Sequence, residues 1–138
     1  MGRRRKSREV GLQLLYQLDV QGESNPEPHF DEFWSRHPVD AEAREFAEAL
    51  VRGTKFHETK IDEVISQYAE NWQLDRMAVV DRNILRQGIF ELLWMGDAPP
   101  KVVINEALEI AKKFSTHESS RFINGILDRI HKELHPPA

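Results

Sequence analysis

Apolar residues along the 138-residue chain recur every three or four positions, which is the spacing of amphipathic helices rather than of strands. In the first half, this pattern predicts helices over residues 7–20, 41–52 and 54–68. Asp40 is a preferred N-cap residue, and we interpret Gly53 as a break or a kink between the second and third of these helices.

The second half of the chain continues the helical pattern. Three helices are predicted there: residues 76–95 after the cap Asp75, residues 100–114 opened by Pro100, and residues 118–134 closed by His135-Pro136-Pro137. No segment alternates steadily between apolar and polar residues, so we expect no sheet. The chain is therefore predicted to be all-α, a compact bundle of about six or seven helices in one domain over residues 1–138.

The segment 23–39 lies between the first two predicted helices and is rich in proline and in acidic residues. Phe30, Phe33 and Trp34 within it predict a short packed helix inside a loop. The acidic residues of this segment do not indicate a function for it.

Charge is distributed unevenly along the chain. The formal net charge is −4, yet residues 1–8 hold five basic side chains and no acidic one, which leaves 14 basic and 23 acidic side chains in the remainder. An acidic body repels a polyanion everywhere except at such a basic arm. The arm therefore indicates either a nucleic-acid contact or a feature that only supports solubility.

Several functions lack the residues that they require. The chain has no cysteine, no apolar run long enough for a membrane span or a signal peptide, no glycine-rich phosphate loop and no nucleophilic triad. His131 and His135 have the spacing of two metal ligands on a helix, but no third ligand accompanies them. We therefore expect a cytoplasmic binding protein that is not an enzyme and holds no cofactor or metal.

The first predicted helix carries a row of side chains beside its apolar stripe. On a helical wheel this row, the Arg5–Asp19 row, consists of Arg5, Arg8, Leu12, Tyr16 and Asp19. Two guanidinium groups in line with an aromatic ring could meet phosphates and dock a partner. Alternatively, Tyr16 lies at the edge of the core with a hydrated hydroxyl group.

Phe122 departs from the apolar stripe of the last predicted helix. It lies about 100° from the centre of that stripe, on the side of Arg121, Gly125 and Arg129. A phenylalanine flanked by arginines is a candidate platform for stacking an RNA base. The other interpretation is that Phe122 packs against a second helix, with Gly125 allowing a close approach.

The helix predicted over 76–95 carries further polar candidates. Arg86 is expected on its polar side, where it would be solvated, paired with a carboxylate or part of a basic surface. Asp81 is interpreted as a first-turn residue favoured by the helix dipole. Together with Glu91, it is a candidate for hydrogen bonding or partner binding rather than for acid–base catalysis.

Three stretches, in this order and spacing, resemble the NusB family of transcription antitermination factors. They are Arg3-Arg4-Arg5 through Arg8-Glu9 to Leu12-Gln13-Leu14-Leu15-Tyr16; Asp81-Arg82-Asn83-Ile84-Leu85-Arg86 with Glu91-Leu92; and Val103-Ile104-Asn105-Glu106-Ala107 with Ala111-Lys112-Lys113-Phe114 and Phe122-Ile123-Asn124-Gly125-Ile126-Leu127-Asp128. The chain departs from the family at Gln87-Gly88, which places glycine inside a helix, and in the 23–39 loop.

The resemblance implies an all-α fold of two helical subdomains and a factor that acts with NusE, a small-subunit ribosomal protein. The pair would bind single-stranded boxA RNA in ribosomal RNA leaders and promote read-through within an RNA polymerase antitermination complex, and the RNA-free protein could form a homodimer. Carried onto this chain, the implied RNA-binding residues are Arg3, Arg4, Arg5, Arg8, Arg86, Phe114, Ser119, Arg121 and Phe122. The implied protein-partner residues are Tyr16, Asp81 and Glu91.

Two other functions were weighed against this one. A NusB-like module of a ribosomal RNA methyltransferase is disfavoured, because no cofactor-binding βαβ unit follows in the sequence. A pure protein adaptor, in which the basic arm only supports solubility, remains open.

Overall fold

Helices dominate the computed structural model of the chain, which describes residues 2–69 and 73–134 and, within these ranges, the side chains from Arg4 onward. The α-helices are α1 (Gly2–Gln21), α2 (Phe30–Arg36), α3 (Ala41–Phe56), α4 (Glu58–Tyr68), α5 (Val79–Phe90), α6 (Pro100–Phe114) and α7 (His117–Glu133). Shorter helical turns are η1 (Glu27–His29), η2 (Leu74–Arg76) and the π-helical η3 (Glu91–Met95). The described ranges contain no strand, and the all-α prediction is confirmed.

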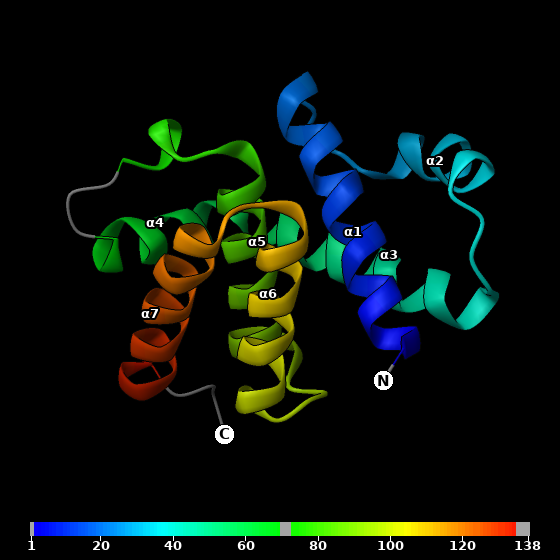
Figure 1. Ribbon diagram of the computed structural model, residues 1–138. Helices are drawn as coiled ribbons and strands as arrows, with labels where there is room; N and C mark the ends of the chain where they lie inside the picture. The colour runs from blue at the N-terminus through cyan, green and yellow to red at the C-terminus, as the bar shows by residue number, and fades with distance from the viewer. Residues whose placement is uncertain (1, 70–72, 135–138) are drawn as a thin grey trace.

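Two hydrophobic clusters divide the molecule. One joins α1, α2 and α3 around Leu14, Phe33 and Val51. The larger one joins α4 to α7 with residues of α1 and α3, and includes Leu12 and Leu50. Figure 1 shows α1 and α2 on one side of the molecule and α4, α6 and α7 on the other. The prediction of two helical subdomains is confirmed.

Helix α1 is buried on two sides because it lies between these clusters. Leu14 and Leu18 enter the smaller cluster, whereas Leu12 enters the larger one. The helix begins at Gly2 rather than at the predicted residue 7, so the basic residues that follow Gly2 are its first turns and not a separate arm. Arg8, which was assigned to the arm, lies inside the fold as a result.

Two predicted boundaries were wrong for identifiable reasons. Gly53 lies inside α3, and the following helix starts only after His57. A Cβ atom on Gly53 would collide with the ring of Phe90, so this glycine allows a close approach rather than a break. Helix α5 starts at Val79 rather than near residue 76, because Asp75 belongs to the 3-10 turn η2 and is followed by extended backbone at Met77.

Other predicted boundaries were correct. Asp40 caps α3 by accepting a hydrogen bond of 2.8 Å from the backbone N–H of Ala43, and Pro100 begins α6. The short packed helix expected in the 23–39 loop is α2, whose three aromatic side chains are buried. The expected stop at His135-Pro136-Pro137 lies outside the described residues.

Asp19 holds α1 against α5 through an ionic network. Its carboxylate accepts two hydrogen bonds of 2.7 Å from Arg82, and further ones from Asn83 and Arg86. Burial alone would raise the pKa of Asp19, but the hydrogen bonds from Arg82 and Asn83 and the charge of Arg86 lower it to about 2. The ionised form of Asp19 therefore stabilises the fold.

Replacing Asp19→Asn tests this network. The native pKa lies below the ordinary value of 3.8, so the stabilisation is present above that value and is lost as the pH falls toward 2. We expect the free energy of unfolding at neutral pH to fall by about 2 kcal/mol. Urea titrations should show the difference from wild type shrinking once the pH drops below about 4.

The exposed Asp97→Asn variant is the control, and its stability should follow that of wild type. A D19N deficit that stays constant down to the lowest pH at which the protein folds would contradict the assigned pKa.

Candidate nucleic-acid interface

The basic start of α1 is partly committed to contacts within the protein. Arg5 donates two hydrogen bonds of 2.7 Å to the carboxylate of Glu106 in α6, and its side chain is 38% exposed. The hydrogen bond from Arg5 lowers the pKa of Glu106. Arg4 is exposed and lies 3.8 Å from the ring centroid of Phe46, a cation–π contact. The side chain of Arg3 lies outside the described residues.

Arg8 and Glu91 form a buried ion pair. Arg8 donates two hydrogen bonds of 2.7 Å to Glu91, and the side chains are 5% and 3% exposed. A buried guanidinium group needs such a partner because an unpaired charge is costly inside a protein. Neither side chain reaches the surface, so the buried pair does not favour the predicted contacts of Arg8 with RNA and of Glu91 with a protein partner, which stay predictions.

Arg86 also points inward. It donates hydrogen bonds of 2.8 and 3.0 Å to Asp62 in α4 and one of 3.0 Å to Asp19, and its side chain is 8% exposed. Burial is the largest influence on Asp62 and raises the pKa of its carboxyl, although Arg86 opposes this effect. Of the alternatives weighed, pairing with a carboxylate is correct, and a basic surface at Arg86 is not.

The charged members of the Arg5–Asp19 row therefore fasten α1 to its neighbours. Its members contact α6 through Arg5, η3 through Arg8, and α5 through Asp19. Only Tyr16, which is 45% exposed, reaches solvent extensively. The helical wheel correctly placed these side chains in one row, but it did not predict that the charged ones are paired with other helices.

The turn between α6 and α7 is fastened to α5 by one carboxylate. Asp81 accepts hydrogen bonds of 2.6 Å from the Ser115 hydroxyl and 2.7 Å from the Ser119 hydroxyl, one on each oxygen. Thr116 caps α7 by accepting a hydrogen bond of 2.9 Å from the Ser119 backbone N–H. The three residues Asp81, Ser115 and Ser119 are called the Asp81 clamp below.

Phe122 and Arg121 lie beside the start of α7 on a shallow groove. This groove has a volume of about 320 Å³ and is also lined by Tyr68, Gly125 and Arg129. Phe122 is half-buried and packs against the larger cluster, whereas Arg121 is exposed. Phe122 thus packs against the core and also lines the groove. A Cβ atom on Gly125 would meet nothing within 4 Å, so the close approach predicted at this glycine is wrong, and base stacking by Phe122 stays a prediction.

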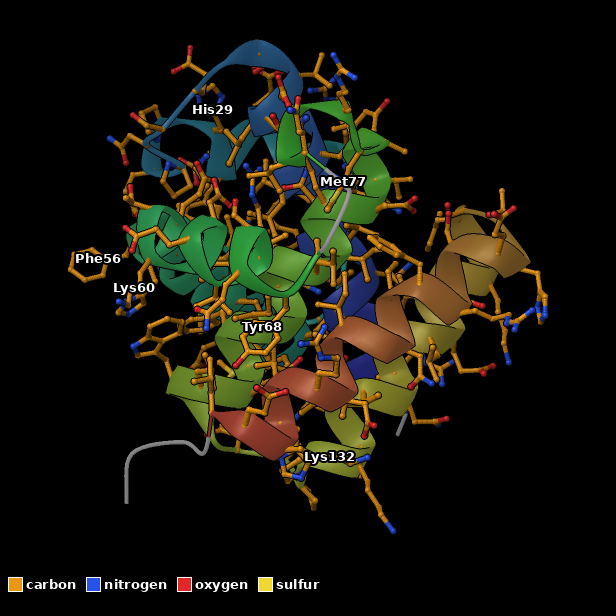
Figure 2. All side chains as sticks on the ribbon, turned by 90° about the vertical axis from the view of Figure 1, so that its left-hand side faces the viewer. His29, Phe56, Lys60, Tyr68, Met77 and Lys132 are labelled. Atoms are coloured by element: carbon orange, nitrogen blue, oxygen red, sulfur yellow. The ribbon has the colours of Figure 1, made fainter. Side chains whose placement is uncertain are left out.

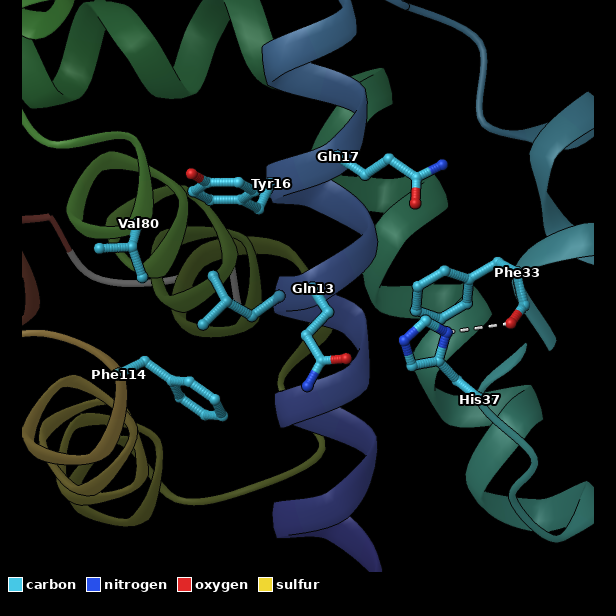
Figure 3. Close-up of a pocket in the computed structure, with 8 residues that line it drawn as sticks. Gln13, Tyr16, Gln17, Phe33, His37, Val80 and Phe114 are labelled. Carbon is cyan, nitrogen blue, oxygen red and sulfur yellow. Dashed lines mark hydrogen bonds between the residues drawn. The ribbon is translucent and has the colours of Figure 1, made fainter.

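A second, larger groove crosses α1. Figure 3 shows Tyr16 on α1 with Phe114 and Val80 on one side of the helix and His37 on the other. The groove has a volume of about 490 Å³ and a mostly apolar lining. Gln13, Val80 and His37 were missed by the sequence analysis, because their pattern carries no signal until α1, α2 and α5 are packed together.

The interface offers binding groups rather than a reaction centre. No cluster of three or more His, Asp or Glu side chains that could hold a metal ion occurs among the described residues. No helix in the described part of the chain is long and apolar enough to cross a membrane. What the grooves present are aromatic faces, guanidinium groups and amides, which suit stacking and hydrogen bonding.

Comparisons with known proteins identify a family. The profile of the NusB family matches residues 5–132. The transcription antitermination protein NusB of Anaeromyxobacter dehalogenans is 49% identical over 99% of this chain and 94% of its own length. That of Myxococcus xanthus is 45% identical over 99% of this chain and 100% of its own.

Solved structures agree with these matches. T. maritima NusB is 42% identical and superimposes with a TM-score of 0.87, covering 97% of this chain and 93% of that one. A chain in the crystal structure of antitermination factors NusB and NusE in complex with dsRNA is 31% identical, with a TM-score of 0.87 over 96% of this chain and 98% of that one.

Substitution of the buried Arg8 tests its structural assignment. Arg8→Met leaves the Glu91 carboxylate buried without its partner, so we expect the free energy of unfolding to fall by about 3–5 kcal/mol. Arg4→Met, at an exposed position on the same helix, should change it by less than about 1 kcal/mol. Chemical denaturation of both variants measures the two values, and equal effects would refute the assignment.

Proposed function

The chain belongs to the NusB family of transcription antitermination proteins, and from this premise we propose that it binds boxA RNA of ribosomal RNA leaders together with NusE. The complex would promote read-through by RNA polymerase. The relatives are transcription antitermination proteins, which agrees with the prediction that the chain is not an enzyme.

One observation carries the proposal. The chain matches, over 96% of its length, a chain in a crystal structure of antitermination factors NusB and NusE in complex with dsRNA. The extent of the match matters because residues of both hydrophobic clusters line the grooves described above. The match supports the proposal that this chain carries one surface for NusE and one for RNA.

The RNA surface proposed here differs from the full set implied by resemblance. It retains Phe114, Arg121 and Phe122 near the α6–α7 turn and the basic start of α1, and it omits the buried Arg8 and Arg86. Arg5 meets Glu106, eight residues before Phe114, which is about 12 Å along α6. The exposed Lys112 and Lys113 lie in the last turn of this stretch, so cationic groups occur near both ends of the proposed path.

The protein surface proposed for NusE is the groove across α1. Tyr16 is its exposed aromatic side chain on α1, and aromatic anchors in a groove are typical of protein interfaces. Phe114 also lines this groove but is assigned to the RNA surface. Glu91 is omitted from this surface because it is buried against Arg8. Assembly with RNA polymerase, self-association of the RNA-free protein and a cytoplasmic location remain part of the same proposal.

Phe122→Ala tests the RNA surface. Loss of one stacked base weakens binding by about 1–3 kcal/mol, roughly thirtyfold at the middle of that range and tenfold nearer its lower end. The measurement is the affinity for a short boxA RNA, with and without NusE, together with a thermal unfolding curve. The control is Phe56→Ala, since Phe56 is 85% exposed and points away from the body of the protein (Figure 2). Wild-type affinity in F122A would remove the stacking role.

The basic start of α1 is tested by salt dependence. Arg3→Ala combined with Arg4→Ala should reduce the slope of log affinity against log salt by about 1.4, because each phosphate contact on a single strand contributes about 0.7. Lys60→Ala combined with Lys132→Ala is the control, as both lysines are exposed on α4 and α7 (Figure 2). An identical slope in both double variants would show that the start of α1 does not meet phosphates.

A further inference from the structure

We propose that Asp81 is a positioning residue for RNA binding, which acts by holding the two aromatic side chains on either side of the α6–α7 turn. This inference rests on the proposed function. It assigns Asp81 and Ser119 a role different from the direct contacts implied by family resemblance.

The geometry of the Asp81 clamp commits its groups to one another. Asp81 is 8% exposed, and each of its carboxylate oxygens accepts a hydroxyl hydrogen bond, at 2.6 Å from Ser115 and 2.7 Å from Ser119. Each serine hydroxyl has a single proton to donate, and here that proton points to Asp81. Ser119 therefore has no hydroxyl proton left for an RNA phosphate, and Asp81 has little surface for a partner.

The clamp acts on the rings through the positions of its two serines. Phe114 is the last residue of α6 and directly precedes Ser115. Phe122 follows Ser119 by three residues in α7, so the two side chains are neighbours on the helix surface. A single carboxylate on α5 thus restrains the end of α6 and the first turn of α7 together.

Restraint of this kind favours binding. A turn that is ordered before the ligand arrives loses less conformational freedom when it binds. Phe114 is 36% exposed, and Phe122 is half-buried and lines the groove of α7, so both rings lie partly at the surface at positions that the clamp restrains. Without the clamp, the serines at the turn lose their contacts with α5, and the ordering has to occur on binding.

An alternative is that Asp81 affects RNA binding only through its negative charge, and this alternative predicts different affinities for the Asp81 variants. If Asp81 mattered only as a negative charge near the RNA, both Asp81→Asn and Asp81→Ala would strengthen binding. If it acts as a clamp, Asp81→Asn should retain most of the affinity, because the amide oxygen accepts from one serine and the amide N–H donates to the other hydroxyl. Asp81→Ala should weaken binding.

The experiment measures boxA RNA affinity for wild type, Asp81→Asn, Asp81→Ala and the double variant Ser115→Ala/Ser119→Ala, with thermal unfolding of each. The serine variant breaks the clamp without altering α5. We expect D81A and the serine variant to bind about tenfold more weakly, as expected for the loss of one stacked base. The affinity of D81N should stay within about threefold of wild type. The control is Asp75→Ala, at an exposed position, whose affinity should equal that of wild type.

A combination with Phe114→Ala and Phe122→Ala separates positioning from a general loss of stability. Because Asp81 is proposed to act through the rings of Phe114 and Phe122, adding D81A to the double variant F114A/F122A should weaken binding by no more than about a further twofold. Fully additive effects, unchanged binding in the serine variant, or stronger binding in both Asp81 variants would each overturn the proposal. Absence of RNA binding by wild type, by contrast, would remove the proposed function itself.

Discussion

The structure depends on the requirement that one helix, α1, be buried on two sides at once. Its apolar residues supply both hydrophobic clusters, and the charged members of the Arg5–Asp19 row lie where the clusters meet. Charges in such a place are tolerated only when paired and hydrogen-bonded. The pairs Arg5–Glu106 and Arg8–Glu91, and the pairing of Asp19 with Arg82, satisfy this requirement along the length of the helix.

The paired charges also set the geometry of the binding surfaces. An apolar contact alone tolerates sliding, whereas bidentate arginine–carboxylate pairs fix orientation. Because α1 is held to α6 through Arg5 and to α5 through Asp19, the groove that includes Tyr16 and Phe114 acquires a defined shape. The Asp81 clamp extends the same principle from α5 to the α6–α7 turn. The proposed binding surfaces are thus built on helices held in place by buried polar groups.

Most of the fold could be predicted from local pattern, and much of the site could not. Helical periodicity and capping residues located α3, α6 and α7 well, because these signals lie within each segment. The burial of Arg8 depends on Glu91, which is 83 residues away in the chain, and no local rule contains that information. The role of Gly53 could not be predicted for the same reason, because this glycine leaves room for the ring of Phe90, which is distant in the sequence. The unusual position of Phe122 could be predicted, because its displacement from the apolar stripe is a property of its own helix alone.

The central claim is that the arginines of the fold divide into buried pairs and a separate RNA-facing set, and it has a direct test. Guanidinium NMR signals of Arg8, Arg86 and Arg121 can be followed while boxA RNA is added to the isotope-labelled protein. The account predicts that Arg8 and Arg86 keep their positions and slow exchange, because their partners are Glu91 and Asp62, while Arg121 shifts. Large shifts at Arg8 and Arg86 with none at Arg121 would contradict it.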